Sequence, residues 1–215
     1  MCNANCIIFG ANNLSSEEIK DKKVIEVGAY NLNGSLQKII KKQKPSEYIG
    51  VDIEIGPGVD IVCNIEDLVN KFGENSFDLV ISTELLEHVK DWHLGISNLK
   101  KICRPGGIIL ITTRSFGFSY HSYPFDYWRY EVEDMNNIFS DFEILSIEKD
   151  PQDCGVFVKV RKKENTPEKD LSDFKLYNII SDKRVLKFDE KDLRSLRYIF
   201  ISLKEKLKRK LKKLI

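Results

Sequence analysis

Between residues 23 and 162, short apolar runs alternate with stretches of helical pattern, and this alternation constrains the fold more than any other feature of the sequence. The runs with the length and composition of β-strands lie at 23–28, 47–52, 60–63, 77–82, 107–113, 142–148 and 155–161. Helical patterns lie between them, near 34–42, 65–71, 92–102 and 131–139. Strands that alternate with helices in this way form a parallel sheet that is covered on both faces. The sequence therefore predicts an α/β fold with a doubly wound, mostly parallel sheet.

Two of the predicted strands contain uninterrupted apolar runs, at 79–81 and 108–111, as expected of strands that are buried on both faces. In such sheets a ligand binds beyond the carboxyl ends of the strands, where the strand order reverses. The segments that directly follow strands are therefore expected to form the site, and they are 28–34, 52–54, 63–66, 82–88 and 113–130.

The end of the chain differs in charge from the rest. Residues 194–215 carry nine Lys or Arg and one Glu, a net charge of +8, whereas the preceding residues hold 25 basic and 32 acidic side chains, a net charge of −7. This acidic balance argues against a nucleic-acid-binding face on the body of the protein. We expect a folded domain over 1–162 with a helical lead-in over 1–20, a linker over 163–191, and a separate basic helix over 192–215.

The basic helix is also amphipathic, because its apolar side chains recur at intervals of three and four and line one face. They are Leu193, Leu196, Ile199, Phe200, Leu203, Leu207, Leu211 and Leu214. Such a helix is suited to lie in the interface of a membrane, attracted to anionic lipid. The alternative is that it docks on the acidic body or on a second subunit.

Other features point to the cytoplasm. No apolar run approaches the roughly 20 residues that span a bilayer. The first residues, MCNANCIIFGANN, lack the basic and apolar regions of a signal peptide. The five cysteines are odd in number and scattered, which is typical of reduced thiols in a cytosolic protein. We therefore expect a cytoplasmic protein that is peripheral to a membrane.

The loop after the first predicted strand contains Gly28 and Gly34, which suit a tight turn beside a ligand and the start of a helix. The G-x-G-x-x-G fingerprint of dinucleotide-binding folds is broken by Tyr30 and Asn33, which disfavours a nicotinamide oxidoreductase. Glu26, near the end of the strand, suits a cationic ligand. Asp52 ends the second strand, 24 residues after Gly28, and an acid at this position can accept both hydroxyls of a ribose.

Five ordered blocks carry a family resemblance: VIEVGAYNLNGS, YIGVDIEIGPGVDIVCNIEDL, SFDLVISTELLEHVKDW, LKKICRPGGIILITTRS and YHSYPFDYWRYEVEDM. Over about residues 20–162 the chain resembles the class I S-adenosylmethionine-dependent methyltransferases of the type 11 group. This resemblance implies a seven-stranded Rossmann-like sheet in the order 3-2-1-4-5-7-6 and S-adenosylmethionine as cofactor. The sequence departs from the commonest first motif of the family, which has further glycines at the positions of Tyr30 and Leu32.

The resemblance also implies which residues contact the cofactor. The first strand and its loop would flank the methionine part, and Asp52 would hold the ribose. The residues after the second and third strands would lie along the adenine, and those after the fourth strand beside the sulfonium. The predicted cofactor residues are Glu26, Gly28, Gly34, Asp52, Ile53, Asn64, Ile65, Thr83 and Glu84.

Catalytic candidates follow the fourth and fifth strands. A neutral histidine can remove a hydroxyl proton, so His88 or His121 is a candidate general base, with Asp126 as a carboxylate alternative. In another interpretation, Glu87 and His88 only organise the wall of the pocket. In a third, Glu84, Glu87 and His88 hold a divalent metal, which resembles quinone-biosynthesis O-methyltransferases that carry a similar E-x-x-E-H run.

The segment 116–130 contains eight of the 22 aromatic residues of the chain, and in the family this segment commonly forms the substrate wall. Tyr123, Trp128 and Arg129 are the predicted substrate contacts, although a buried aromatic plug is the alternative for Trp128. Together with these residues, the resemblance implies a methyltransferase that acts on a small molecule or glycan, most simply at oxygen. A cofactor-binding accessory protein without turnover and a metal-dependent quinone-type O-methyltransferase are the alternatives.

Overall fold

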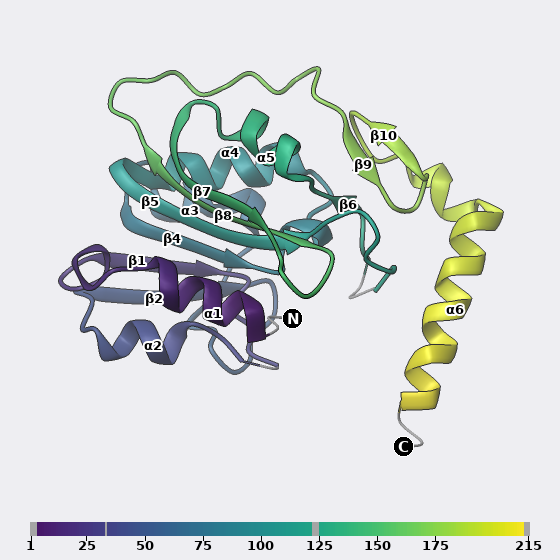
Figure 1. The fold of residues 1–215 in the computed structure, drawn as a ribbon, viewed down its shortest axis with the longest axis horizontal. Helices are drawn as coiled ribbons and strands as arrows, with labels where there is room; N and C mark the ends of the chain where they lie inside the picture. The colour runs from purple at the N-terminus through teal and green to yellow at the C-terminus, as the bar shows by residue number, and fades with distance from the viewer. Residues whose placement is uncertain (1–3, 33, 122–124, 213–215) are drawn as a thin grey trace.

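The computed structural model describes residues 4–32, 34–121 and 125–212, and its centre is one twisted sheet (Figure 1). The sheet has seven strands in the order β3-β2-β1-β4-β5-β8-β7. Their bounds are β1 Lys23–Val27, β2 Glu47–Asp52, β3 Ile61–Val62, β4 Phe77–Thr83, β5 Cys103–Arg114, β7 Phe142–Lys149 and β8 Gly155–Lys162. Strand β6 Trp128–Arg129 lies outside this sheet, so in chain order the seven strands run 3-2-1-4-5-7-6, as the family resemblance implies.

Strands β1 to β5 are mutually parallel, whereas β8 pairs antiparallel with both β5 and β7. The carboxyl ends of β1, β2, β4 and β5 therefore meet at one edge of the sheet. Strand β1 lies between β2 and β4. The chain runs outward from β1 through β2 to β3 and then returns to β4 on the other side of β1, so this edge contains the point at which the strand order reverses. The segments predicted to form a site are brought together at this edge.

Helices cover both faces of the sheet (Figure 1). One face carries α3 Leu68–Phe72, α4 Trp92–Ile102 and α5 Val132–Ile138, and the other carries α1 Ala4–Asn13 and α2 Gln37–Lys42. Successive residues of a strand point to opposite faces, so Ile109 and Ile111 pack with α4 while Ile108 and Leu110 pack with α1 and α2. The uninterrupted apolar runs therefore have the double burial that the sequence predicts.

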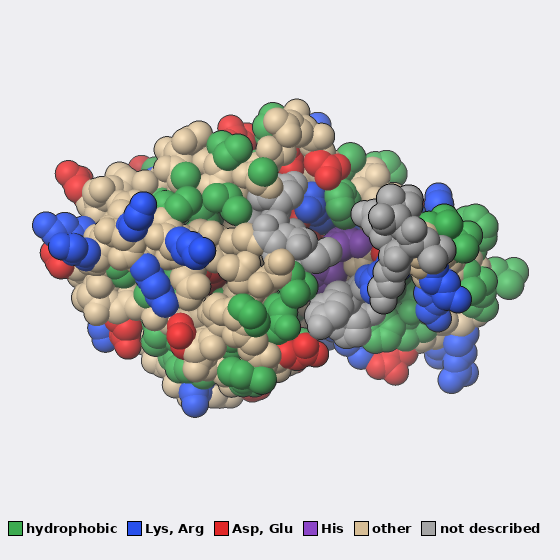
Figure 2. Space-filling view, turned by 90° about the horizontal axis from the view of Figure 1, so that it is seen from below, with side chains coloured by type: hydrophobic (Ala, Val, Ile, Leu, Met, Phe, Trp, Pro, Cys, Tyr) green, Lys and Arg blue, Asp and Glu red, His purple; other side chains and the backbone are tan. Residues whose placement is uncertain are grey.

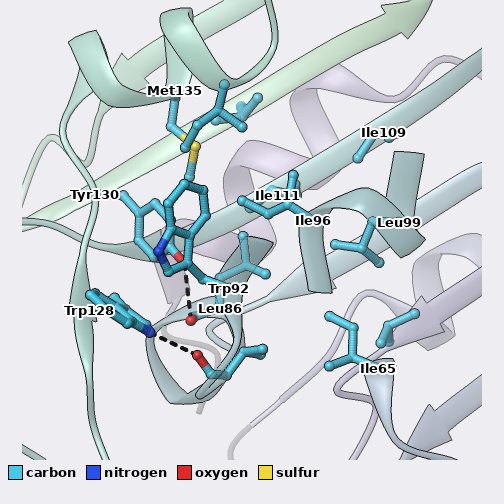
Figure 3. Packing of buried hydrophobic residues seen from close by; sticks show 14 of the residues in the cluster. Ile65, Leu86, Trp92, Ile96, Leu99, Ile109, Ile111, Trp128, Tyr130 and Met135 are labelled. Carbon is cyan, nitrogen blue, oxygen red and sulfur yellow. Dashed lines mark hydrogen bonds between the residues drawn. The ribbon is translucent and has the colours of Figure 1, made fainter. Parts of the chain in front are cut away.

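The larger core contains a group of aromatic side chains next to α4 and α5 (Figure 3). Trp92 and Trp128 are fully buried, with ring centroids 6.5 Å apart and their planes steeply inclined. The indole nitrogen of Trp128 donates a hydrogen bond to the carbonyl oxygen of Val89 at 2.9 Å, and the hydroxyl of Tyr130 donates to that of Leu86 at 3.2 Å (Figure 3). These bonds attach the segment after β5 to the short helical turn after β4.

The prediction of a linker over 163–191 is corrected by the structure. Strands β9 Leu176–Asn178 and β10 Lys183–Val185 lie in this stretch and form a second sheet, in the order β10-β9-β6, with β6 Trp128–Arg129. Leu176 and Ile180 are fully buried and belong to the larger core. The apolar residues of this stretch gather at 174–180 (FKLYNII), but the run is short and has neither a clear helical nor a clear strand period, so the sequence pattern alone does not reveal their burial.

The basic helix is present as α6 Leu196–Lys212, which follows a short helical turn at Glu190–Arg194 and extends beside the body (Figure 1). Tyr198 and Ile201 pack against the larger core, and the ring of Tyr198 meets that of Tyr120 edge to face with centroids 6.0 Å apart. Within residues 4–32, 34–121 and 125–212, no helix is long and apolar enough to cross a membrane.

Candidate functional site

A cavity of about 1110 Å³ opens at the carboxyl edge of the sheet. It lies between the loops after β1, β2, β4 and β5 and the inner side of α6, and histidine side chains are visible within the hollow of this face (Figure 2). All nine predicted cofactor residues line the cavity: Glu26, Gly28, Gly34, Asp52, Ile53, Asn64, Ile65, Thr83 and Glu84. His88 and His121 line it as well. The structure thus brings the predicted cofactor residues and two predicted catalytic residues into one site.

The loop after β1 needs glycine at Gly28. Its φ is +85°, and a Cβ added there would lie 3.0 Å from the Cβ of Leu85. At Gly34 φ is +127°, and the Asn31 side chain accepts a hydrogen bond from its backbone N–H at 2.9 Å. The loop therefore closes tightly over the end of the strand without the further glycines of the commonest family motif.

Asp52 joins the loops after β1 and β2. Its carboxylate accepts hydrogen bonds from the backbone N–H groups of Tyr30, at 3.0 Å, and Ile53, at 2.7 Å. Each carboxylate oxygen has further lone pairs, and the side chain lines the cavity, so it can still accept the two hydroxyls of a ribose. An adenine fits beside Ile53 and Ile65, which are apolar and also line the cavity.

Glu26 lies deeper in the site, almost fully buried, and accepts a hydrogen bond from the hydroxyl of Tyr48. Burial raises the pKa of Glu26 to about 7 from an ordinary value of 4.5, although the Tyr48 hydroxyl opposes the shift. A cationic ligand group in the cavity would favour the ionised carboxylate. The residues present therefore fit S-adenosylmethionine: an acid for the ribose, apolar walls for the adenine and a buried carboxylate near a positive charge.

The raised pKa of Glu26 predicts a pH-dependent loss of stability. Between about pH 4.5 and 7 the folded chain keeps a proton that the unfolded chain has released, so the free energy of unfolding decreases as the pH rises through this window. The Glu26→Gln variant lacks this titration. Between pH 4.5 and pH 8, the difference in unfolding free energy between the two proteins should therefore shift in favour of the variant by up to about 3 kcal/mol. Urea unfolding of both proteins at the two pH values measures the difference, and equal pH profiles would contradict the assignment.

Glu84 directly follows β4 and is held in the left-handed region, with φ of +55°. Its carboxylate forms a buried ion pair with Arg114, and the thiol of Cys6 donates to it at 3.4 Å. Burial and the nearby charge of Glu87 raise the pKa of Glu84, against the attraction of Arg114. The Glu84 carboxylate is thus paired within the wall of the cavity at the cofactor end. It is therefore not available as the metal ligand of the alternative interpretation.

Glu87, His88 and His121 form a second group, which we call the histidine cluster. The Nε2 atoms of His88 and His121 lie 3.9 and 3.8 Å from Oε1 of the fully buried Glu87. Burial lowers the pKa of His88, more than the charge of Glu87 raises it. Burial opposes the ionisation of Glu87, but the two imidazoles lower its pKa overall. At neutral pH the cluster is therefore a carboxylate beside a neutral His88.

The protons of the two imidazoles are located by their partners. Nδ1 of His88 lies 2.6 Å from the carbonyl oxygen of Phe125, which can only accept a hydrogen bond, so Nδ1 carries the proton. Nδ1 of His121 lies 2.8 Å from the carboxylate of Asp126. Burial opposes the ionisation of Asp126, but its hydrogen bonds to Arg129 and His121 hold its pKa well below the usual range. Nε2 of the neutral His88 therefore presents a lone pair, and Nε2 of His121 lies at a similar distance from the same Glu87 oxygen.

The placement of Asp126 and Arg129 differs from the predicted roles. The Arg129 guanidinium bonds both oxygens of the Asp126 carboxylate at 2.6 Å, and both side chains are almost fully buried. Neither residue lines the cavity. A carboxylate with a lowered pKa and four donors is a poor proton acceptor, so Asp126 orients His121 instead of acting as a base. Arg129 in turn holds Asp126 in place.

Trp128 also differs from its predicted role as a substrate contact. Its ring lies in the core and does not reach the cavity, because Trp92 and the strand β9 enclose it. Tyr123, the third predicted substrate contact, lies outside the described residues. Tyr120, Phe118 and Phe125 line the cavity in place of Trp128 and Arg129.

Sequence reasoning missed two parts of the site. Arg114 ends β5, lines the cavity and stacks over the ring of Phe118, with its guanidinium carbon 4.0 Å from the ring centroid. An arginine directly after an uninterrupted apolar strand is a signal that could have identified it. The other part is α6, whose Glu205, Lys208 and Arg209 line the far side of the cavity. No local pattern predicts that contact, because it depends on the path of residues 163–191.

Comparisons with known proteins agree with this geometry. The profile of the methyltransferase domain family matches residues 10–149. No curated protein matches the chain by sequence. Among solved structures, the Burkholderia thailandensis 1,6-didemethyltoxoflavin-N1-methyltransferase, with S-adenosylhomocysteine bound, is similar with a TM-score of 0.60 and 14% identity. The match covers 74% of this chain and 79% of that one.

Two further structures share the fold. An S-adenosylmethionine-dependent methyltransferase from Mesorhizobium loti has a TM-score of 0.53 and 16% identity, and the match covers 71% of this chain and 100% of that one. The CurJ carbon methyltransferase has a TM-score of 0.52 and 17% identity, over 74% of this chain and 54% of that one. Since the family profile covers most of the chain and the residues of the cavity fit the cofactor, this protein belongs to the methyltransferase domain family, the class I enzymes that use S-adenosylmethionine.

Proposed function

We propose that this methyltransferase acts on a hydroxyl oxygen of a small-molecule or glycan acceptor that lies against the histidine cluster. The observation that carries the proposal is the convergence of two imidazole Nε2 atoms and the Glu87 carboxylate beside a cavity that also holds the predicted cofactor residues. A hydroxyl group must lose its proton when it is methylated, and a group of proton acceptors suits that requirement.

In this proposal the residues of the chain divide the work along the cavity. Bound S-adenosylmethionine supplies a methyl group on a positively charged sulfur. Asp52 binds the ribose, and Glu26 lies near the positive charge of the methionine part. Phe118 and Tyr120 exclude water at the acceptor end, and the histidine cluster takes the hydroxyl proton.

The solved structures with this fold do not determine the acceptor atom, because they include an N-methyltransferase and a carbon methyltransferase. The choice of oxygen therefore rests on the histidine cluster alone. A ring nitrogen with a free lone pair needs no proton acceptor, whereas a hydroxyl does. A protein that only bound the cofactor would need neither imidazole in a fixed tautomer.

The Asp52→Ala variant tests the cofactor site. It removes a charged hydrogen-bond partner, so we expect the binding free energy of S-adenosylmethionine to weaken by about 1.5–3 kcal/mol in calorimetric titration. The Asp60→Ala variant is the matched control, because Asp60 accepts a backbone bond of Gly50 and does not line the cavity. Unchanged affinity in a folded Asp52→Ala protein would contradict the assignment.

A methyl-transfer assay against extracted cell glycans and lipids, with mass detection of the product, tests the activity itself. A product with the added mass of one methylene on an oxygen supports the proposal. Cofactor binding without any product from these extracts favours the accessory protein, and a product methylated at nitrogen or carbon contradicts the choice of oxygen.

We also propose that α6 docks the protein on the cytoplasmic surface of an anionic membrane. Tyr198, Ile201 and Glu205 face the body and are half-buried, so the apolar stripe on the other side of the helix is exposed. The stripe consists of Leu196, Ile199, Phe200, Leu203, Leu207 and Leu211, each between 46% and 86% exposed. On a helix, Lys204, Lys206 and Lys210 border this stripe, which favours an anionic lipid surface.

Membrane docking would also suit the position of the cavity. The inner side of α6 lines the cavity through Glu205, Lys208 and Arg209. A helix that lies in the membrane interface would therefore hold the opening close to the lipid surface. An acceptor carried on a lipid could then enter the cavity without leaving the membrane.

Binding to liposomes tests the role of α6. The full chain should co-sediment with vesicles that contain anionic lipid and be released at high salt. Leu203→Ser removes one leucine that would be buried in the lipid, and it should weaken the partitioning of the protein to vesicles by about 1.5–3 kcal/mol, roughly 10- to 100-fold. Ser202→Ala, on the neighbouring position outside the stripe, should leave partitioning unchanged. Equal partitioning of all three proteins would mean that the stripe docks elsewhere.

A further inference from the structure

The histidine cluster has an electrostatic property that proton acceptance alone does not account for. Three acceptor atoms, one from each of Glu87, His88 and His121, lie within 4.8 Å of one another. Each imidazole has its Nδ1 atom bonded to an oxygen acceptor, so its Nε2 atom is the one that lies near the Glu87 oxygen. That oxygen, Oε1, is buried and has no hydrogen-bond partner in the described residues. A buried carboxylate oxygen without a hydrogen bond is costly, and a positive charge placed among these three side chains would stabilise it.

Each of the three side chains is held by a second partner. The Phe125 carbonyl holds His88, the Asp126 carboxylate holds His121, and the hydroxyl of Thr113 donates to the other oxygen of Glu87 at 2.8 Å. Arg129 in turn holds Asp126. Carbonyl and carboxylate partners on the far ring nitrogen are typical of histidines that bind a metal, because they set the tautomer and the orientation of the ring.

We propose that Glu87, His88 and His121 form a binding site for a divalent transition-metal ion, with open coordination positions toward the cavity. Two imidazoles and one carboxylate suit zinc, iron(II), cobalt(II) or nickel(II), and they do not suit magnesium, which takes oxygen ligands. Metal–ligand bonds of about 2.1 Å place neighbouring ligand atoms about 3–3.5 Å apart, so the Nε2 atoms need to approach Oε1 by less than about 1 Å.

The structure selects these ligands over those of the sequence-based alternative. Glu84 forms an ion pair with Arg114 and receives the thiol of Cys6, so it is already neutralised. His121, which lies 33 residues beyond His88 in the sequence, takes its place. A cation at the cluster would occupy the nitrogen atoms that otherwise accept the hydroxyl proton, and it would instead polarise the acceptor oxygen in the cavity so that this proton leaves to water. This chemical role rests on the proposed function, whereas the binding of the metal does not.

Titration with cobalt(II) tests the proposal. The full chain, without a polyhistidine tag, is dialysed against a chelator and then titrated with Co²⁺, and visible absorption reports the coordination of the ion. We expect saturation at one equivalent. His121→Gln and Glu87→Gln should each weaken Co²⁺ binding by about 100-fold or more, and Asp126→Asn, which removes an outer partner, by about 10- to 100-fold. Circular dichroism checks that each variant is folded.

His93→Gln is the matched control. His93 is the remaining histidine of the chain, lies outside the cluster and contacts the Leu171 carbonyl at 3.0 Å, so its replacement should leave Co²⁺ binding unchanged. Absence of stoichiometric Co²⁺ binding to the natural chain would overturn the proposal, as would equal binding by the His121→Gln variant. Titration of the same proteins with S-adenosylmethionine separates this proposal from the proposed function. If Co²⁺ does not bind but S-adenosylmethionine does, the histidines remain the proposed proton acceptors and only the metal site is wrong.

Discussion

Replacing His121 with Gln is expected to lower the turnover number about 10²–10⁴-fold, the usual contribution of a group that manages a proton in the transition state. His121 lines the cavity, places Nε2 near the Glu87 carboxylate and is held by the buried Asp126. Glutamine keeps a similar length and polarity but has no ring nitrogen that can accept a proton or bind a metal. The measurement is the turnover number on the acceptor that the extract assay identifies.

The binding of S-adenosylmethionine should stay unchanged in this variant, because His121 contributes nothing to the loops after β1 and β2. His93→Gln serves again as the control, with turnover near that of the natural chain. If His121→Gln keeps near-normal turnover, the enzyme acts by positioning alone, and the histidine cluster is only part of the wall of the cavity.

Trp128→Ala is expected to lower the free energy of unfolding by about 3–5 kcal/mol, the typical cost of removing a large aromatic ring from a core. The ring is fully buried, packs against Trp92 and donates a hydrogen bond to the Val89 carbonyl. Its removal leaves a cavity and an unpartnered carbonyl oxygen beside the histidine cluster. Urea unfolding followed by circular dichroism measures the change.

Phe116→Ala is the matched control in the same segment, because Phe116 is 61% exposed and should change the stability by less than about 1 kcal/mol. Trp128→Phe keeps most of the ring volume and should lose less stability than Trp128→Ala. A stable Trp128→Ala protein with weakened acceptor binding would restore the substrate role that the sequence predicts for this residue.

Much of the fold could be predicted from the sequence because it depends on local periodicity. The predicted strand at 77–82 and the helix at 92–102 correspond to β4 Phe77–Thr83 and α4 Trp92–Ile102. Parallel strands place their carboxyl ends at one edge, so residues that directly follow strands must meet there. This is why Glu26, Asp52 and Glu84, which are far apart in the sequence, line one cavity as expected.

The predictions for the segment after β5 were less accurate, since that segment has no regular period. Its composition indicates an aromatic wall, but not which rings point inward. Trp128 enters the core because β6 pairs with β9, about 50 residues later in the chain. The same pairing makes residues 163–191 part of the folded body, although their charged composition indicates a linker.

The family resemblance supplied the strand order and the residues expected to contact the cofactor. The sequence pattern by itself determined the doubly wound sheet, the strand ends at which the cavity opens and the amphipathic basic helix. Each of these depends on side-chain periodicity or on strand ends that a parallel sheet must bring together. Only the tertiary structure decided that Asp126 is bonded by Arg129 and orients His121, that Glu87 faces two imidazole Nε2 atoms, and that the apolar stripe of α6 is exposed. These arrangements depend on which buried polar groups find partners across distant parts of the chain, and no local pattern encodes that pairing.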